Sequence, residues 1–210
     1  MKKYFSIFFI ATLLCCEISA QQIIADIARK YYRSNPFESE FSQFLVHLMN
    51  DPTLKDKSIH KRTDSTLFFM EGIYTDHNPF SFKGRETKII LAEKEEAEND
   101  SAGSLQITYL YQLVAYALPG EEGIKNIREE FDKFCRHYKR KFDGDNYKEL
   151  KSAEKQVGEI RDYISGSTGF SPLSVAWATS NEQNNNLIAI TIRFRVFDNR
   201  AYLPLIQDVF

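Results

Sequence analysis

Along residues 104–118 the side chains fall into two alternating sets, one of them consistently apolar. This pattern restricts the possible folds more than any other part of the sequence. The odd-numbered positions are large and apolar: Leu105, Ile107, Tyr109, Tyr111 and Leu113. The opposite positions include the polar residues Gln106, Thr108 and Gln112. A period of two indicates a β-strand, because successive side chains point to opposite faces of a sheet. Residues 187–197 alternate in the same way, so we expect two long strands.

Other segments complete an outline of the secondary structure. Strand-forming composition predicts further strands over 66–75, 87–93 and 174–179. Apolar residues at helical spacing predict helices over 22–32, 36–49, 121–142 and 147–164. Asn35 is expected to cap the second of these helices, and Asp51–Pro52 to end it. We expect loops at 53–64 and at the acidic segment 93–103.

This outline predicts the α+β class. Consecutive strands joined by short turns pair in antiparallel fashion. Strands and helices that are grouped separately along the chain favour an antiparallel sheet of about five strands packed with helices on one or both faces. We expect a single domain over 21–210, because no segment after residue 20 has the composition or length of a linker.

The first twenty residues have the pattern of a cleaved secretory signal peptide. Lys2 and Lys3 are followed by an uncharged run from Tyr4 to Cys16, and Ala20 is a small residue at the expected cleavage position. Cleavage there would leave Cys135 as the one cysteine of the mature chain. We expect a buried thiol, because this residue lies on the apolar stripe of a predicted helix.

A second interpretation of the leader is a lipoprotein signal in which Cys16 is acylated. The residue before the modified cysteine is then usually small, whereas Leu14 precedes Cys15 and Cys15 precedes Cys16. The leader, ending Ser19-Ala20-Gln21-Gln22, resembles those of the small exported proteins of unknown function in Bacteroidetes-type bacteria. This resemblance covers the leader only, and it implies export but no activity or site residues.

Several function classes are poorly supported by the composition. Lysine and arginine total 27 against 29 for aspartate and glutamate, which argues against a strongly basic nucleic-acid-binding surface. The histidines and Cys135 lack the spacing of a zinc site, and no G-x-S-x-G nucleophile motif occurs. We therefore predict no metal, no cofactor, no nucleic-acid partner and, unless the chain is lipidated, no membrane contact.

Four residues are candidates for ligand binding. Arg193 and Arg195 share the side of their strand opposite the isoleucines, about 7 Å apart. Arginine binds carboxylates and phosphates through two parallel hydrogen bonds, so this pair predicts a site for an anion or for an acidic segment of a partner. Tyr74 and His77 fall in a dense group of special residues at the end of a strand, where they could line a site at the sheet edge.

The function that these features favour is that of an exported cell-envelope protein, periplasmic or on the cell surface. We expect a non-catalytic module that binds a protein or a small anionic ligand through a polar sheet face. The alternative is an exported hydrolase or transferase whose catalytic residues meet only in the fold, around Tyr74, His77, Arg193 and Arg195.

Overall fold

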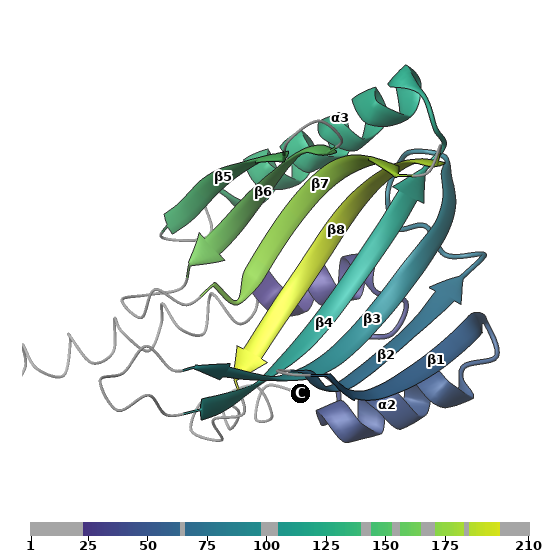
Figure 1. Cartoon of the computed structure of the whole chain (residues 1–210), viewed down its shortest axis with the longest axis vertical. Coiled ribbons are helices and arrows are strands. Elements are labelled where there is room, and N and C mark those ends of the chain that lie inside the picture. The colour runs from purple at the N-terminus through teal and green to yellow at the C-terminus, as the bar shows by residue number, and fades with distance from the viewer. Residues whose placement is uncertain are drawn as a thin grey trace, which may run out of the picture.

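Eight antiparallel strands join in one sheet in the described part of this computed structural model (Figure 1). The model describes residues 23–63, 66–97, 105–139, 144–152, 156–164, 171–182 and 185–197. The strands are β1 (Leu54–Thr63), β2 (Thr66–Tyr74), β3 (Gly84–Ala97), β4 (Leu105–Ala117), β5 (Gly144–Ser152), β6 (Gln156–Ile164), β7 (Leu173–Glu182) and β8 (Asn185–Phe197). The helices are α2 (Phe41–Asn50) and α3 (Glu121–Tyr138), and residues 23–31 are also helical.

The strand order is β1-β2-β3-β4-β8-β7-β6-β5. The chain therefore builds one half of the sheet from β1 to β4, crosses to the far edge through α3, and returns strand by strand until β8 pairs with β4. This arrangement confirms the predicted α+β class and the antiparallel pairing. The predicted number of about five strands was too low, because three strands were assigned to a loop or to a helix.

Residues 147–164, predicted as a helix, form most of β5 and β6, so that prediction is wrong. Leu150, Val157 and Ile160 recur at helical spacing, but the free edge of β7 offers a ladder of backbone hydrogen bonds to β6. Packing and pairing of this kind override a weak local preference for helix. Gly158 fits the strand because a Cβ there would lie 2.4 Å from the backbone oxygen of Trp177.

Two predicted loops are also strands, wholly or in part. Residues 54–63 form the edge strand β1, whose many charged residues conceal it from a search for apolar alternation. Charged side chains are common on edge strands because they oppose pairing with other molecules. The acidic segment begins inside β3, which continues to Ala97.

The helices near the N-terminus agree with prediction except at one boundary. α2 begins at Phe41 and not at Pro36. Asn35 Oδ1 accepts a hydrogen bond from the backbone N–H of Phe37, 3.0 Å away, and so closes a local turn instead of capping a helix. The predicted end at Asp51–Pro52 is confirmed, since α2 ends at Asn50.

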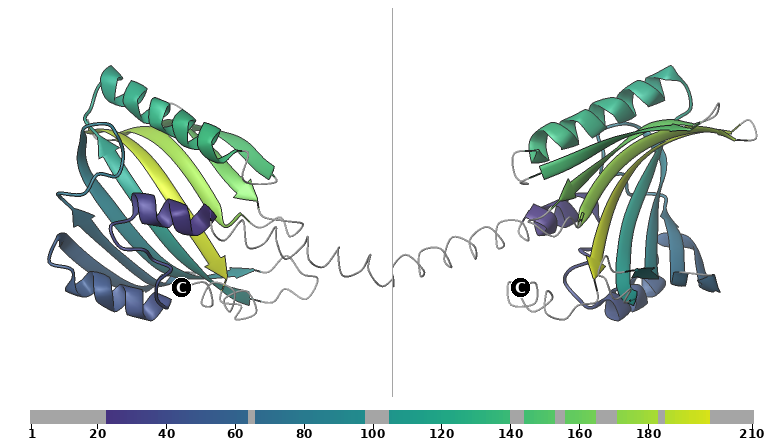
Figure 2. Two further views of the ribbon diagram at one scale, coloured as in Figure 1. Left: turned by 180° about the vertical axis from the view of Figure 1, so that it is seen from behind. Right: turned by 60° about the vertical axis from the view of Figure 1, so that its left-hand side comes forward.

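All three helical segments lie on one face of the sheet, which we call the helix face (Figure 2). The core lies between them and this face, and its fully buried members include Ile27, Phe44, Phe131, Phe134, Met70, Leu91, Leu113 and Ile192. Tyr32 donates its hydroxyl proton toward the backbone oxygens of Tyr111 and Ile192, at 3.2 and 3.3 Å. Cys135 is buried as predicted, and this burial raises the pKa of its thiol.

Several predictions concern residues outside the described ranges. These are the signal peptide, the lipidation site at Cys16, the part of the acidic loop after Ala97 and the last residues of the third predicted helix. Among the described residues, no helix has the length and apolar character needed to span a membrane.

Candidate functional site

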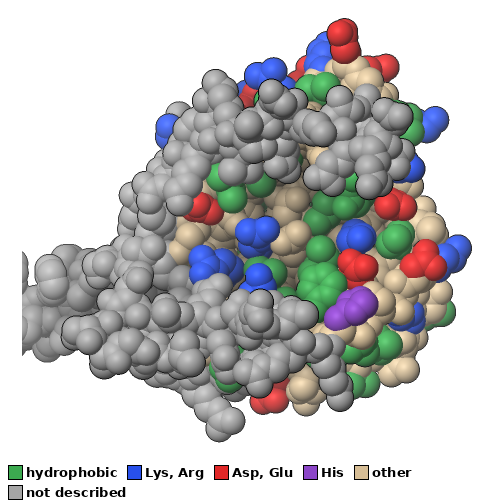
Figure 3. Space-filling model, viewed as in Figure 1, with side chains coloured by type: hydrophobic (Ala, Val, Ile, Leu, Met, Phe, Trp, Pro, Cys, Tyr) green, Lys and Arg blue, Asp and Glu red, His purple; other side chains and the backbone are tan. Residues whose placement is uncertain are grey.

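Arg193 and Arg195 lie on the face of the sheet opposite the helices. Their neighbours Ile192 and Phe194 point into the core and are fully buried. Because side chains alternate along β8, both arginines point the other way. No helix of the described ranges covers that side, which we call the open face. Figure 3 views it directly, and lysine and arginine side chains gather near its centre.

Gln112 of β4 holds Arg193 in place. The two residues are directly paired across β4 and β8, and Arg193 Nε donates a hydrogen bond to Gln112 Oε1 at 2.8 Å. The structure thus places the polar positions of the two alternating segments side by side on one face. Burial of the guanidinium, followed by the charge of Arg195, lowers the pKa of Arg193.

Arg193 forms no ion pair within the described part of the chain, although the charge of Asp162 partly offsets the lowering of its pKa. Asp162 lies in the same cross-strand row, two strands away beyond Ser174, with its backbone about 10 Å from that of Arg193. Glu71 is engaged elsewhere, because its carboxylate lies 3.1 Å from Lys88 Nζ. Arg193 and Arg195 therefore place two guanidinium groups on one side of β8, and Gln112 accepts a hydrogen bond from Nε of Arg193 and not from its terminal nitrogens.

Tyr74 lies on the helix face and is buried among core side chains. Its hydroxyl lies near the Asp51 carboxylate without a well-formed hydrogen bond. Burial, followed by the charge of Asp51, raises the pKa of this phenol. A buried and neutral tyrosine of this kind contributes to packing more than to chemistry.

His77 follows β2 and joins two parts of the structure. Its Nε2 lies 3.1 Å from the backbone oxygen of Tyr31, and its ring meets that of Tyr74 edge-on with centroids 5.6 Å apart. The structure therefore brings Tyr74 and His77 together on the helix face, while Arg193 and Arg195 lie on the open face. A single catalytic group made of all four residues is not assembled.

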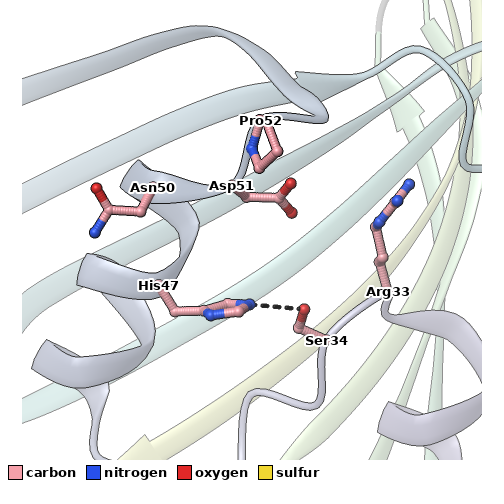
Figure 4. A pocket seen from close by; sticks show the side chains of 6 residues that line it. All are labelled: Arg33, Ser34, His47, Asn50, Asp51 and Pro52. Carbon is pink, nitrogen blue, oxygen red and sulfur yellow. Dashed lines mark hydrogen bonds between the residues drawn. The ribbon is translucent and has the colours of Figure 1, made fainter.

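A shallow depression that the sequence analysis did not find lies beside α2 (Figure 4). Its volume is about 330 Å³, and Arg33, Ser34, His47 and Asp51 contribute to its lining. Ser34 Oγ lies 3.1 Å from His47 Nε2. This is the distance expected between a serine nucleophile and the histidine that acts as its general base. No sequence motif links these residues, because they meet only through the turn at 32–40.

Asp51 does not complete a catalytic triad with them. Its Oδ1 accepts hydrogen bonds from the backbone N–H and the hydroxyl of Thr53, at 2.8 and 2.6 Å. The carboxylate points toward Arg33 and not toward His47 (Figure 4). This geometry makes Asp51 the stabiliser of the turn after α2, and the depression lacks the third group that would orient the histidine.

No group of three or more histidine, cysteine, aspartate or glutamate side chains within the described ranges is placed to hold a metal ion. No family model, curated protein or solved structure matches the chain. The functional argument therefore depends on the chemistry of the site itself.

Proposed function

We propose that this chain is an exported, non-catalytic binding protein that holds an anionic ligand on the open face of its sheet. The observation that carries the proposal is Arg193, a half-buried guanidinium that lies next to a second arginine and forms no ion pair within the described residues. Removing a charge from water is costly unless a partner compensates it. An anion bound at this place would supply that compensation.

The geometry suits a carboxylate or phosphate group. A guanidinium presents its donors in a planar fork that matches two oxygen atoms of such a ligand. Gln112 occupies Nε of Arg193 and so orients the terminal nitrogens, and Arg195 adds a second guanidinium two residues along the same strand. The sheet supports both side chains on regular strands, which limits the entropy lost on binding.

Export is the second part of the proposal, and the leader sequence supports it. The leader also permits anchoring through Cys16, in which case the binding protein is held at a membrane. Mass spectrometry of the mature N-terminus separates the two forms, because one begins at Gln21 and the other carries a lipid on Cys16.

Binding of a fluorescent anion such as anilinonaphthalene sulfonate to the purified protein tests the ligand site. We expect saturable binding that weakens about tenfold or more in Arg193→Gln, because each charge-assisted hydrogen bond contributes about 1.5–3 kcal/mol. Arg193→Lys keeps the charge but not the fork, and should show an intermediate loss. Arg136→Gln, an exposed arginine on α3, removes the same charge from the other side and is the control.

Equal affinities in wild type, Arg193→Gln and Arg195→Gln would overturn the proposal. Far-UV circular dichroism and the melting temperature of each variant show whether a loss of binding reflects a loss of fold.

A further inference from the structure

The row of residues that crosses the open face at Arg193 holds one positive and one negative side chain near each other, and neither belongs to an ion pair within the described ranges. Arg193 of β8 pairs with Ser174 of β7, and Ser174 pairs with Asp162 of β6. Asp162 and Arg193 therefore point to the same side of the sheet, with their backbones about 10 Å apart. The other acid of this row, Glu71 of β2, is paired with Lys88.

The hydrogen bond to Gln112 helps to keep these two charges apart. Gln112 lies on β4, on the other side of β8 from Asp162, and its Oε1 accepts a hydrogen bond from Arg193 Nε. This contact draws the guanidinium toward β4 and away from β6. Ser174 lies between the two charged residues, and its side chain is too short to bridge them. A molecule with two charged ends could do so.

The spacing of the row defines the length of such a molecule. A charge-assisted hydrogen bond between nitrogen and oxygen is about 2.7–2.9 Å long. With one such bond at each end, an interval of about 10 Å leaves about 4–5 Å between the ammonium nitrogen and the carboxylate of the ligand. An α-amino acid is too short, because one carbon separates its two charged groups, whereas two or three carbons are sufficient.

The next row on the open face provides a contact for the carbon chain. On β8, β7 and β6 it consists of Thr191, Ala176 and Ile160, which are uncharged and partly exposed. Methylene groups of a ligand can lie against these side chains, and the burial of that apolar surface adds to the affinity. None of the three competes for either charged end of the ligand.

We infer that the ligand is a small zwitterion, an amino carboxylate whose carboxylate binds Arg193 and whose ammonium group binds Asp162, with two or three carbons between them. This inference rests on the proposed function and adds the chemical class of the ligand. A simple anion would compensate the charge of Arg193 but would be repelled by Asp162. A zwitterion compensates both charges, because its ammonium group turns that repulsion into an attraction.

Three ligands of similar shape test the inference on the wild-type protein. γ-Aminobutyrate carries both charges, pentanoate has a methyl group in place of the ammonium, and butylamine has a methyl group in place of the carboxylate. We expect calorimetry to show that γ-aminobutyrate binds at least about fivefold more tightly than either, because each of the others lacks one charge-assisted contact. Glycine, with one carbon between its charges, should also bind more weakly than γ-aminobutyrate.

The substitution Asp162→Asn tests the ammonium contact directly. It should lower the affinity for γ-aminobutyrate to about that for pentanoate, while the affinity for pentanoate stays the same or rises because the repulsion is lost. Asp132→Asn is the matched control, since it removes the same charge from an exposed position of α3, on the helix side of the sheet. Its affinity for γ-aminobutyrate should equal that of the wild type. Far-UV circular dichroism of each variant shows whether the fold is kept.

The outcomes separate this inference from the proposal on which it rests. If pentanoate or glycine binds as tightly as γ-aminobutyrate and Arg193→Gln weakens both, only the inference is overturned. The same conclusion follows if Asp162→Asn leaves the affinity for γ-aminobutyrate unchanged, or if the fluorescent anion binds in a manner that depends on Arg193 and γ-aminobutyrate does not bind. If Arg193→Gln weakens the binding of none of these ligands, both statements are wrong.

Discussion

Individual residues acquire their roles here from the partners that the fold provides. Tyr74 and Arg193 were both candidates for the same site, but one is buried on the helix face and the other lies on the open face. Asp51 was expected only to end a helix, yet its carboxylate also organises the following turn by accepting two hydrogen bonds from Thr53.

The environment of Asp51 leads to a prediction about how the stability of the protein depends on pH. Burial by itself would raise the pKa of this carboxyl, but the hydrogen bonds from Thr53 and the charge of Arg33 outweigh it and lower the pKa below its ordinary value. A lowered native pKa stabilises the folded protein above the unfolded pKa of about 4, and this contribution disappears as the pH falls through the native value. Asp51→Asn should therefore lose about 0.5–1 kcal/mol at neutral pH, because the group is partly exposed.

Urea unfolding of wild type and Asp51→Asn at neutral pH and near pH 3 measures this difference, which should shrink at the lower pH. Asp132→Asn, on an exposed part of α3, serves as the control. A difference that stays constant with pH would contradict the assigned role of the carboxylate.

At the scale of elements, strands are recognisable from the sequence where one face is apolar and the other polar. β4 and β8 have this pattern, and both were predicted close to their observed bounds. β1 lacks it because, at this edge of the sheet, Lys55, Asp56, Ile59 and His60 are all exposed to water. β6 lacks it because Arg161 and Glu159 lie on the same face as Tyr163, so the apolar alternation is broken.

A substitution at Gly158 tests the close pairing of β6 and β7. Gly158→Ala would place a Cβ 2.4 Å from the Trp177 backbone oxygen and 2.9 Å from Ala178 Cα, and neither atom can move without shifting β7. We expect a loss of about 1–3 kcal/mol in the free energy of unfolding.

Gly72→Ala is the matched comparison for this substitution. The three atoms nearest to its Cβ would all belong to the Leu54 side chain, with Cγ at 2.7 Å, and that side chain can adjust. The loss should therefore be smaller than at Gly158. Wild-type stability in Gly158→Ala would show that β6 and β7 do not approach as closely as described.

The whole molecule is organised by an aromatic core that joins parts far apart in the sequence. The Phe134 ring of α3 lies 5.7 Å from the ring of Tyr31, which ends the N-terminal helix. It also lies 6.2 Å from the ring of Tyr163 in β6. One side chain thus links the first described helix, the crossover helix and the far half of the sheet.

Phe134→Ala should lower the free energy of unfolding by about 3–5 kcal/mol, because it leaves a cavity at this junction. If the described segments fold as one unit, Trp177 fluorescence and far-UV circular dichroism should still report coincident transitions. Val46→Ala, on the exposed side of α2, should change stability by less than about 0.5 kcal/mol. Separate transitions for the two probes in the wild type would contradict cooperative folding of the two halves.

The sequence by itself determined the α+β class, the antiparallel pairing, the two central strands and the common direction of Arg193 and Arg195, because these depend on the local period of side chains. Tertiary structure alone decided that residues 144–152 and 156–164 are paired strands, that 54–63 completes an edge, and that all the described helices lie on one face. It also separated Tyr74 and His77 from the arginines, and brought Gln112 to Arg193 across 81 residues of chain. The reason is that strand pairing and burial depend on partners distant in sequence, and local periodicity carries no information about which partners will meet.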